Sequence, residues 1–188
     1  MYGTPKLNNT YARLSRQQKG EHWIEALNDG RHVLIRPLQP ADREREFQFI
    51  RHLSPEARRA RFLGTLSEPG EKLMEQLMDV DHHEREAYVA LEFVDGELRE
   101  IGVARYSGVL AQARCECAVV VADAWQRCGL GNRLLIHLMD SARRNGFARM
   151  SSLDLSSNVG AERLFKGLGF SRHYAEDAFS EMVHEIEL

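Results

Sequence analysis

A glycine-containing loop between an apolar strand pattern and an amphipathic helix pattern constrains this chain more than any other feature. Val119, Val120 and Val121 end the apolar run, and Gly129 and Gly131 stand at the start of the helical pattern. The first backbone N–H groups of a helix lack partners inside the helix, and the helix dipole makes this end positive. The sequence therefore predicts a cradle of main-chain amides for a phosphate or pyrophosphate group.

Length and composition narrow the class of protein. The 188 residues are enough for one domain with its own core, and 43% hydrophobic with 28% charged residues is typical of a globular chain. The net charge of −3 provides no positive field, so we expect no nucleic-acid partner. No apolar run approaches the roughly 18 residues of a membrane span, and residues 1–20 lack the apolar core of a signal peptide. We expect a cytoplasmic protein without a membrane partner.

The cysteines and the paired histidines do not form a metal-binding pattern. Cys115 and Cys117 lie on one face of a predicted strand, without a second pair at zinc spacing, and we interpret them as small buried residues. Cys128 lies inside the glycine loop, where a helix N-terminus can lower a thiol pKa, which leaves a redox role open. His82 and His83 are interpreted as part of a solvated turn. We expect no metal.

The pattern predicts an N-terminal extension, residues 1–29, followed by one domain, residues 30–188. Within the extension, Trp23, Ile24 and Leu27 form an apolar cluster, for which we expect a short helix docked on the domain. The domain opens with a strand at residues 31–38 that is closed by Pro37.

Helix and strand patterns fill the rest of the domain. We expect five helices. One is capped by Asp42, one runs from Ser54 to a stop at Gly64, one follows a turn at Ser67–Gly70, one runs from Asn132 to Arg144, and one runs from Asn158 to Leu168. Strands are expected at 87–94, 101–106, 115–121, 147–155 and 181–188. Asp95-Gly96 predicts a hairpin, and the intervening helix makes strand 147–155 parallel to strand 115–121. Strand 181–188 is expected at a sheet edge, where it could support a homodimer as well as a monomer.

Three phosphate-binding patterns compete for the glycine loop. A P-loop requires Gly-x4-Gly-Lys-Ser/Thr, and the sequence contains no such run. A dinucleotide fingerprint requires a third glycine at the position of Leu134. The third pattern is Gln/Arg-x-x-Gly-x-Gly/Ala, and the sequence Gln126-Arg127-Cys128-Gly129-Leu130-Gly131 matches it without gaps.

With this loop, the chain from Val33 to Leu188 resembles the GNAT N-acetyltransferase superfamily. The motifs that agree in order are Ile35-Arg36-Pro37, Ile101-Gly102-Val103-Ala104, the valine-rich strand, the glycine loop, Asn158, and Leu168-Gly169-Phe170. The resemblance implies an α+β (mixed α/β) fold: a central, mostly antiparallel twisted sheet with helices on both faces and a splayed parallel strand pair. It also implies an N-acetyltransferase that uses acetyl-coenzyme A (acetyl-CoA) as co-substrate.

The resemblance assigns the coenzyme site to the strand, the loop and a later helix. The pyrophosphate would accept hydrogen bonds from backbone N–H groups of Arg127 to Asn132, and the pantetheine arm would lie along Val119 to Val121. Asn158 would contact the coenzyme, cap a helix, or do both. Phe165 occupies the position of a tyrosine that serves many members of the family as general acid. Water or another hydroxyl must therefore protonate the departing thiolate, or the thiolate must leave unaided. The expected coenzyme-binding residues are Val119, Val120, Val121, Gln126, Arg127, Cys128, Gly129, Leu130, Gly131, Asn132, Asn158 and Phe165.

A general base is expected because a lysine-like amine has a pKa near 10.4. At pH 7 about one such molecule in a few thousand is neutral, and deprotonation costs about 4.6 kcal/mol. Glu116 is the candidate catalytic residue, because it lies in the otherwise apolar run Cys115–Val121. Burial beside a thioester would raise the pKa of such a carboxylate toward neutrality. The alternative is a structural glutamate at the sheet rim, paired with Arg105 or Arg114.

A finer resemblance bears on the acceptor. Ser54-Pro55-Glu56 followed by Arg58, Arg61 and Phe62, together with the setting of Glu116, is similar to the acetyltransferase domain of bacterial protein-lysine acetyltransferases of the Pat type. That similarity implies a protein lysine as acceptor, Glu116 as base, and Arg58, Arg61 and Phe62 at the substrate. The alternatives are a solvated helix face for the arginines, a small amine, amino acid or antibiotic as acceptor, and a weakly catalytic acetyl-CoA-binding sensor or interaction module.

Overall fold

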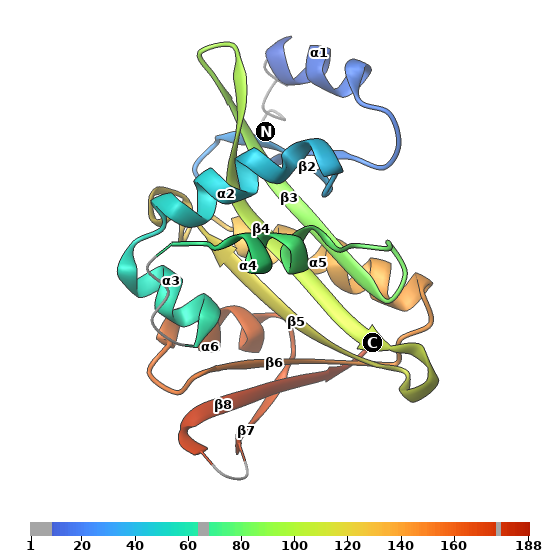
Figure 1. The fold of residues 1–188 in the computed structure, drawn as a ribbon, viewed down its shortest axis with the longest axis vertical. Helices are drawn as coiled ribbons and strands as arrows, with labels where there is room; N and C mark the ends of the chain where they lie inside the picture. The colour runs from blue at the N-terminus through green and yellow to red at the C-terminus, as the bar shows by residue number, and fades with distance from the viewer. Residues whose placement is uncertain (1–8, 64–67, 176–177) are drawn as a thin grey trace, which may run out of the picture.

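One eight-stranded mixed sheet runs through the part of the chain that the computed structural model describes, residues 9–63, 68–175 and 178–188 (Figure 1). Its strand order is β1-β2-β3-β4-β5-β6-β8-β7. Among the strands of the described residues, β5 and β6 alone pair in parallel, and the other neighbouring pairs are antiparallel. The predicted fold class, a mostly antiparallel sheet with one parallel pair, is therefore confirmed.

The strands carry the apolar runs of the sequence. They are β1 (Trp23–Ala26), β2 (His32–Pro37), β3 (Arg85–Val94), β4 (Glu97–Val109), β5 (Arg114–Val121), β6 (Arg149–Leu155), β7 (Ser171–Ala175) and β8 (Ala178–Glu187). In β3 six consecutive residues are buried, because this strand lies inside the sheet with helices on both of its faces. Asp95 and Gly96 form the predicted hairpin turn between β3 and β4, and both have positive φ.

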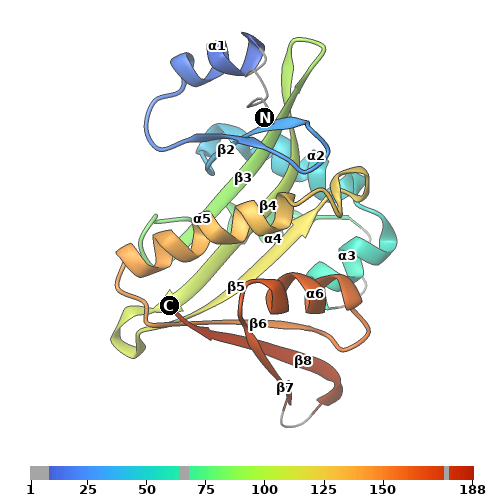
Figure 2. The same cartoon turned by 180° about the vertical axis from the view of Figure 1, so that it is seen from behind.

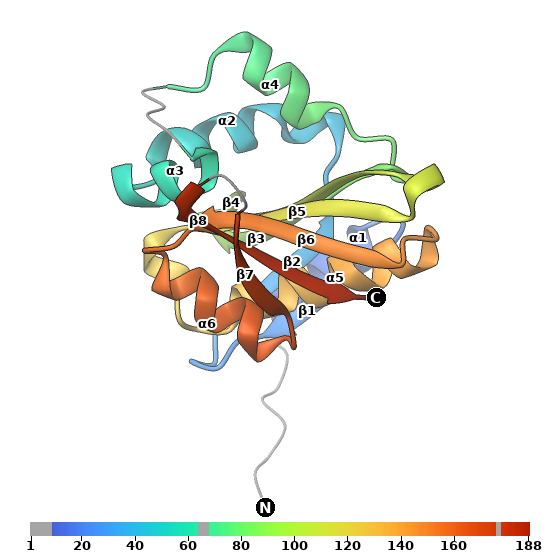
Figure 3. The ribbon, with the colours of Figure 1, turned by 90° about the horizontal axis from the view of Figure 1, so that it is seen from below.

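Helices cover the two faces of the sheet (Figures 2 and 3). The described helices are α1 (Asn9–Gln17), α2 (Arg43–His52), α3 (Pro55–Phe62), α4 (Glu71–Met78), α5 (Leu130–Arg144) and α6 (Val159–Gly167). Short 3-10 turns lie at η1 (Pro40–Asp42), η2 (Leu110–Gln112) and η3 (Asp123–Trp125). Figure 3 shows α2, α3 and α4 on one face and α5 and α6 on the other. None of the helices in the described ranges is long and apolar enough to cross a membrane.

Two apolar clusters, one on each face, hold the layers together. On the first face, α5 contributes Leu134, Leu135, Leu138 and Ala142, all fully buried at helical spacing. The second cluster packs Phe49 of α2 and residues of α4 and α1 against β2, β3 and β4. Side chains alternate between these faces along each strand, so the register of the sheet decides which residues meet under α3 and α4.

A buried ion pair connects β2 to the start of α2. Arg36 donates from both terminal nitrogens to the Asp42 carboxylate, at 2.6 and 2.8 Å, and Asp42 is fully buried. The same carboxylate accepts from the backbone N–H of Gln39 and from Arg45, at 2.9 and 2.7 Å. Asp42 precedes α2 as expected, but it does not cap this helix, because Arg36 and Gln39 occupy its oxygens.

Two expectations about individual segments are wrong. Trp23 and Ile24 lie in a strand, not in a helix, because residues 23–26 pair antiparallel with the free side of β2. Strand β8 is not at the edge: β7, which the sequence pattern did not predict, pairs along its outer side. The boundary at residue 30 stays a prediction and falls inside the β1–β2 hairpin. Gly64 and Ser67, expected to end a helix and begin a turn, lie outside the described residues.

Candidate active site

The parallel strands β5 and β6 separate after three paired positions. The last of these pairs joins Glu116 to Ser151, and from there β5 continues to Val121 with only β4 beside it. The side of residues 117–121 that faces β6 therefore has no strand partner within the described ranges. Such an open strand side can pair with an extended ligand in the manner of an added strand. This confirms the predicted splayed pair and places Glu116 where the two strands diverge.

The glycine loop follows this open strand and turns into α5. Arg127 and Gly129 adopt left-handed backbone conformations, with φ values of 60° and 92°, and Leu130 begins the helix. Within the described part of the chain, the backbone N–H groups of residues 127–132 have no hydrogen-bond acceptor. Six consecutive free donors at the positive end of a 15-residue helix form a site that suits a diphosphate.

The turn between β1 and β2 supports the glycine loop from outside. The backbone N–H of Asn28 donates to the Cys128 carbonyl at 2.9 Å. The Arg31 guanidinium lies 3.7 Å from the ring centre of Trp125 and donates to the Ala124 carbonyl at 3.2 Å. Sequence reasoning assigned no role to Asn28 or Arg31, and only the turn signal Asp29-Gly30 could have indicated that this segment reverses direction beside the domain.

Gly129→Ala is expected to weaken acetyl-CoA binding by about tenfold or more. A Cβ at this position would lie 3.0 Å from the Asn28 side chain, and the φ of 92° costs an L-residue about 1–2 kcal/mol. The strain would shift the loop, so that its backbone N–H groups would no longer be positioned together for one diphosphate. Isothermal titration calorimetry measures the change, with Gly167→Ala as control, because a Cβ there meets nothing within 4 Å. An unchanged dissociation constant in folded Gly129→Ala would contradict the assigned cradle.

Asn158 lies immediately before α6, and Phe165 lies within this helix. The Asn158 side chain accepts from the Ala161 N–H at 3.0 Å, so it caps the helix as expected. Phe165 is buried and stacks on His184 with 4.8 Å between ring centres, which places it in the core. Contact of either residue with the coenzyme stays a prediction.

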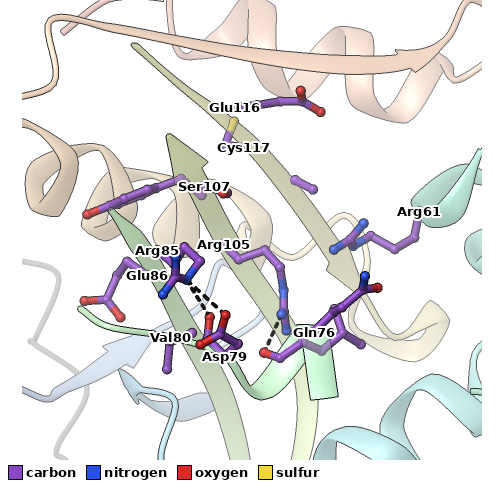
Figure 4. Close-up of a pocket in the computed structure, with 13 residues that line it drawn as sticks. Arg61, Gln76, Asp79, Val80, Arg85, Glu86, Arg105, Ser107, Glu116 and Cys117 are labelled. Atoms are coloured by element: carbon purple, nitrogen blue, oxygen red, sulfur yellow. Dashed lines mark hydrogen bonds and ion pairs between the residues drawn. The ribbon is translucent and has the colours of Figure 1, made fainter. Parts of the chain in front are cut away.

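A pocket of about 370 Å³ lies between the sheet and the segment that carries α3 and α4 (Figure 4). In the register of the sheet, Arg85 of β3, Ser107 of β4 and Glu116 of β5 stand side by side. The pocket therefore includes the point where β5 and β6 diverge. Its lining residues are Arg61, Gln76, Leu77, Asp79, Val80, Arg85, Glu86, Arg105, Tyr106, Ser107, Glu116, Cys117 and Ala118.

Glu116 lies in this pocket with its side chain exposed. The expected burial of the carboxylate is therefore not observed, because Glu116 stands on the open side of the diverging strands. The alternative of a structural pair with Arg105 is also wrong: Arg105 donates to Glu46 at 2.6 Å and to the Leu77 carbonyl at 2.8 Å. Among the residues that the structure describes, no ion pair or hydrogen bond engages the Glu116 carboxylate.

The three predicted substrate residues of α3 occupy different places. Arg61 lines the pocket and extends from α3 toward β5 (Figure 4). Arg58 is not among the lining residues and donates to the Leu53 carbonyl at 2.9 Å, which ties it to the start of its own helix. Phe62 packs partly buried against the apolar cluster under α2 and α4. Of these three side chains, Arg61 alone lines the pocket.

Helix α3 is attached to the loop that precedes the glycines. Ser54, the expected cap, accepts from the Ala57 N–H at 3.2 Å and donates from Oγ to the Asp123 carboxylate at 2.9 Å. Asp123 belongs to η3, between the open strand and the glycine loop. The hydrogen bond between Ser54 and Asp123 therefore links the helix that borders the pocket to the segment that leads into the amide cradle. Sequence reasoning did not identify Asp123 in this role.

The cysteines are free and buried. The burial of Cys115 and Cys117 confirms them as core residues. The same burial raises the pKa of the Cys115 thiol to about 12 and that of Cys117 well above its usual value. The Cys128 thiol donates to the Trp125 carbonyl at 2.8 Å. His82, expected in a solvated turn, is exposed there and bonds through its ring to Glu86 at 2.9 Å.

A sequence profile of the acetyltransferase (GNAT) family matches residues 48–170. The chain is 48% identical over 170 residues, 90% of this chain and 91% of the other, to the protein named acetyltransferase PA5475 of Pseudomonas aeruginosa. The chain therefore belongs to the GNAT acetyltransferase family. The predicted family and enzyme class are confirmed.

Solved structures show the same fold. The GNAT domain of PAT from S. lividans is 24% identical, with a TM-score of 0.80 over 89% of this chain and 97% of that chain. The cAMP-binding acyltransferase from Mycobacterium smegmatis is also 24% identical, with a TM-score of 0.61 over 97% of this chain. The present chain spans 54% of that larger protein.

Proposed function

We propose that this protein transfers an acetyl group from acetyl-CoA to a primary amine, with a protein lysine as the leading acceptor and Glu116 as general base. The observation that carries this proposal is the row of free N–H groups at residues 127–132, which begins just beyond the open strand β5. The residues present fit the coenzyme: the amide cradle suits its diphosphate, and the open side of Val119–Val121 suits the amide groups of its pantetheine arm.

The chain's own groups handle the acceptor and its proton. Acetyl-CoA, when bound, supplies an activated acyl thioester. Glu116 takes one proton from the acceptor ammonium, directly or through water, and the neutral nitrogen can then form the amide bond as the carbon–sulfur bond breaks. The second nitrogen proton goes to the departing thiolate, so the transfer releases one proton in total. Phe165 cannot donate that proton, and we propose water as its carrier.

A small amine, such as an amino acid or an amine antibiotic, is the second candidate acceptor. The pocket volume of about 370 Å³ favours it, since this is within the range of small-ligand sites. A protein lysine would instead insert only its side chain, and the remainder of the substrate would lie outside. The finer similarity of α3 and β5 to protein-lysine acetyltransferases supports the protein acceptor.

Release of free coenzyme A against a panel of acceptors tests the proposal. The panel contains a total protein pool, lysine peptides and small amines, each measured with and without enzyme. Acetylation of the protein pool well above the uncatalysed rate supports the protein-lysine acceptor, and no gain over that rate contradicts it. High kcat/KM with a small amine supports the second candidate. Tight acetyl-CoA binding with no turnover on any member would indicate a sensor or interaction module.

A further inference from the structure

Four of the six charged side chains that line the pocket, those of Asp79, Arg85, Glu86 and Arg105, have ion pairs or hydrogen bonds with neighbours. Arg105 is paired with Glu46 at 2.6 Å. Arg85 is paired with Asp79 at 3.4 Å, as Figure 4 shows. Arg85 also contacts Asp81 at 3.0 Å. Glu86 accepts from the His82 ring and from the Ala87 N–H, both at 2.9 Å. These contacts fix the four side chains in the walls of the pocket and make them less available to a ligand.

Two charged groups of the pocket are different, namely Arg61 and Glu116. Neither has an ion pair or a hydrogen bond with any residue in the described ranges, and they are not paired with each other. Arg61 contacts the ring of Phe62, with 5.0 Å from its guanidinium carbon to the ring centre. One free cation and one free carboxylate therefore line the same pocket, on α3 and on β5.

The Arg61 guanidinium is poorly compensated where it stands. Burial and the nearby positive charge of Arg105 lower its pKa to about 10. The neighbouring carboxylates of Glu46, Glu116 and Asp154 raise it, but they do not offset these effects. An incoming anion would stabilise the charge of a half-buried arginine in this setting, because a guanidinium binds carboxylates through paired, charge-assisted hydrogen bonds.

We infer that the acceptor presents a carboxylate close to its amine, and that Arg61 binds this carboxylate while Glu116 receives the amine. This inference rests on the proposed function and adds the substrate class. The carboxylate has two sources with the same chemistry: the main-chain carboxylate of a small amino acid, and an acidic side chain beside a protein lysine. An acceptor with only an amine would leave the Arg61 charge without a partner.

Two matched pairs of acceptors test the inference. The first pair is Nα-acetyl-lysine and its amide, and the second is an end-blocked peptide with aspartates flanking the lysine and the same peptide with asparagines. In wild type, the acid of at least one pair should show about tenfold or higher kcat/KM than its neutral counterpart, mainly through KM. The pair that shows the difference identifies the source of the carboxylate.

Substitutions at position 61 assign this preference to one side chain. In Arg61→Gln the ratio of kcat/KM for the acid to kcat/KM for the neutral acceptor should fall to about one, and Arg61→Lys should restore part of the preference. Arg59→Gln, on the exposed side of the same helix, is the matched control and should keep it. Thermal unfolding of each variant separates loss of recognition from loss of fold.

Three results would overturn the inference. They are equal use of acid and neutral acceptors by wild type, a preference that survives in Arg61→Gln, and no turnover of any of the four acceptors by enzyme that binds acetyl-CoA. In each of these the coenzyme site stands. Failure of wild type to bind acetyl-CoA would instead contradict the proposed function itself.

Discussion

Glu116→Gln is expected to lower kcat/KM for acetyl transfer by about 100- to 10,000-fold, the range that loss of a general base produces. The amide has nearly the shape of the carboxylate but cannot take the proton from the acceptor ammonium. Glu116 makes no hydrogen bond or ion pair in the described part of the chain and is exposed, so the fold does not depend on its charge. Steady-state rates at saturating acetyl-CoA measure the effect.

The control for this substitution is Glu97→Gln, in the exposed hairpin end of β4, which should retain full activity. Calorimetry should give the same acetyl-CoA affinity for Glu116→Gln and wild type, because the proposed amide cradle lies at the other end of the open strand. Turnover of Glu116→Gln within about threefold of wild type would remove Glu116 as the base.

Asp42→Asn is expected to lower the free energy of unfolding by about 3–5 kcal/mol, because it leaves the buried Arg36 guanidinium without its anion. Asp42 accepts four hydrogen bonds, from both terminal nitrogens of Arg36, from Arg45 and from the Gln39 N–H. Urea unfolding followed by circular dichroism measures the loss. A loss of this size would be a large share of the total free energy of unfolding, which is about 5–15 kcal/mol for a typical domain.

The same pair makes stability depend on pH. Burial raises the pKa of Asp42, but the hydrogen bonds and charge of Arg36 outweigh it, so the pKa in the folded state lies below the usual value. A depressed carboxyl pKa stabilises the fold above the unfolded-state pKa of about 3.9, and this contribution is lost as the pH falls through the folded-state value. The difference between wild type and Asp42→Asn should therefore shrink on acidification.

The exposed pair of Asp140 and Arg143, one turn apart on α5, is the control for Asp42. Asp140→Asn should change stability by less than about 0.5 kcal/mol, because water screens an exposed pair. A loss below about 1 kcal/mol in Asp42→Asn would show that the Arg36 charge is compensated in some other way.

The sequence predicted the parts of the site that local chemistry specifies. An apolar strand, a loop with two glycines and an amphipathic helix can be recognised from residues that are neighbours in the chain, and Gly129 has the positive φ that favours glycine. The Ser54 cap of α3 and the Asp95-Gly96 turn are local signals in the same sense. The splayed pair of parallel strands followed from the family resemblance together with the crossover helix α5.

Features that depend on distant contacts were not predictable. Strand β7 has mostly exposed residues and no alternation, so only its pairing with β8 makes it a strand. The ion pair of Arg105 with Glu46 joins residues 59 positions apart. From the sequence alone, a pairing of Glu116 with Arg105 or Arg114 therefore stayed open as the alternative to its role as base. Arg58 and Arg61 look alike in sequence, yet one binds a backbone carbonyl and the other enters the pocket.

The central claim, that main-chain amides at the start of α5 bind the diphosphate of the coenzyme, is tested most directly by comparing two ligands in calorimetry. Acetyl-CoA carries the diphosphate, and S-acetylpantetheine has the same thioester and arm without it. We predict that wild type binds acetyl-CoA and binds S-acetylpantetheine at least about tenfold more weakly, since several charge-assisted hydrogen bonds are lost. Equal affinities for the two ligands, or no binding of acetyl-CoA, would contradict the claim.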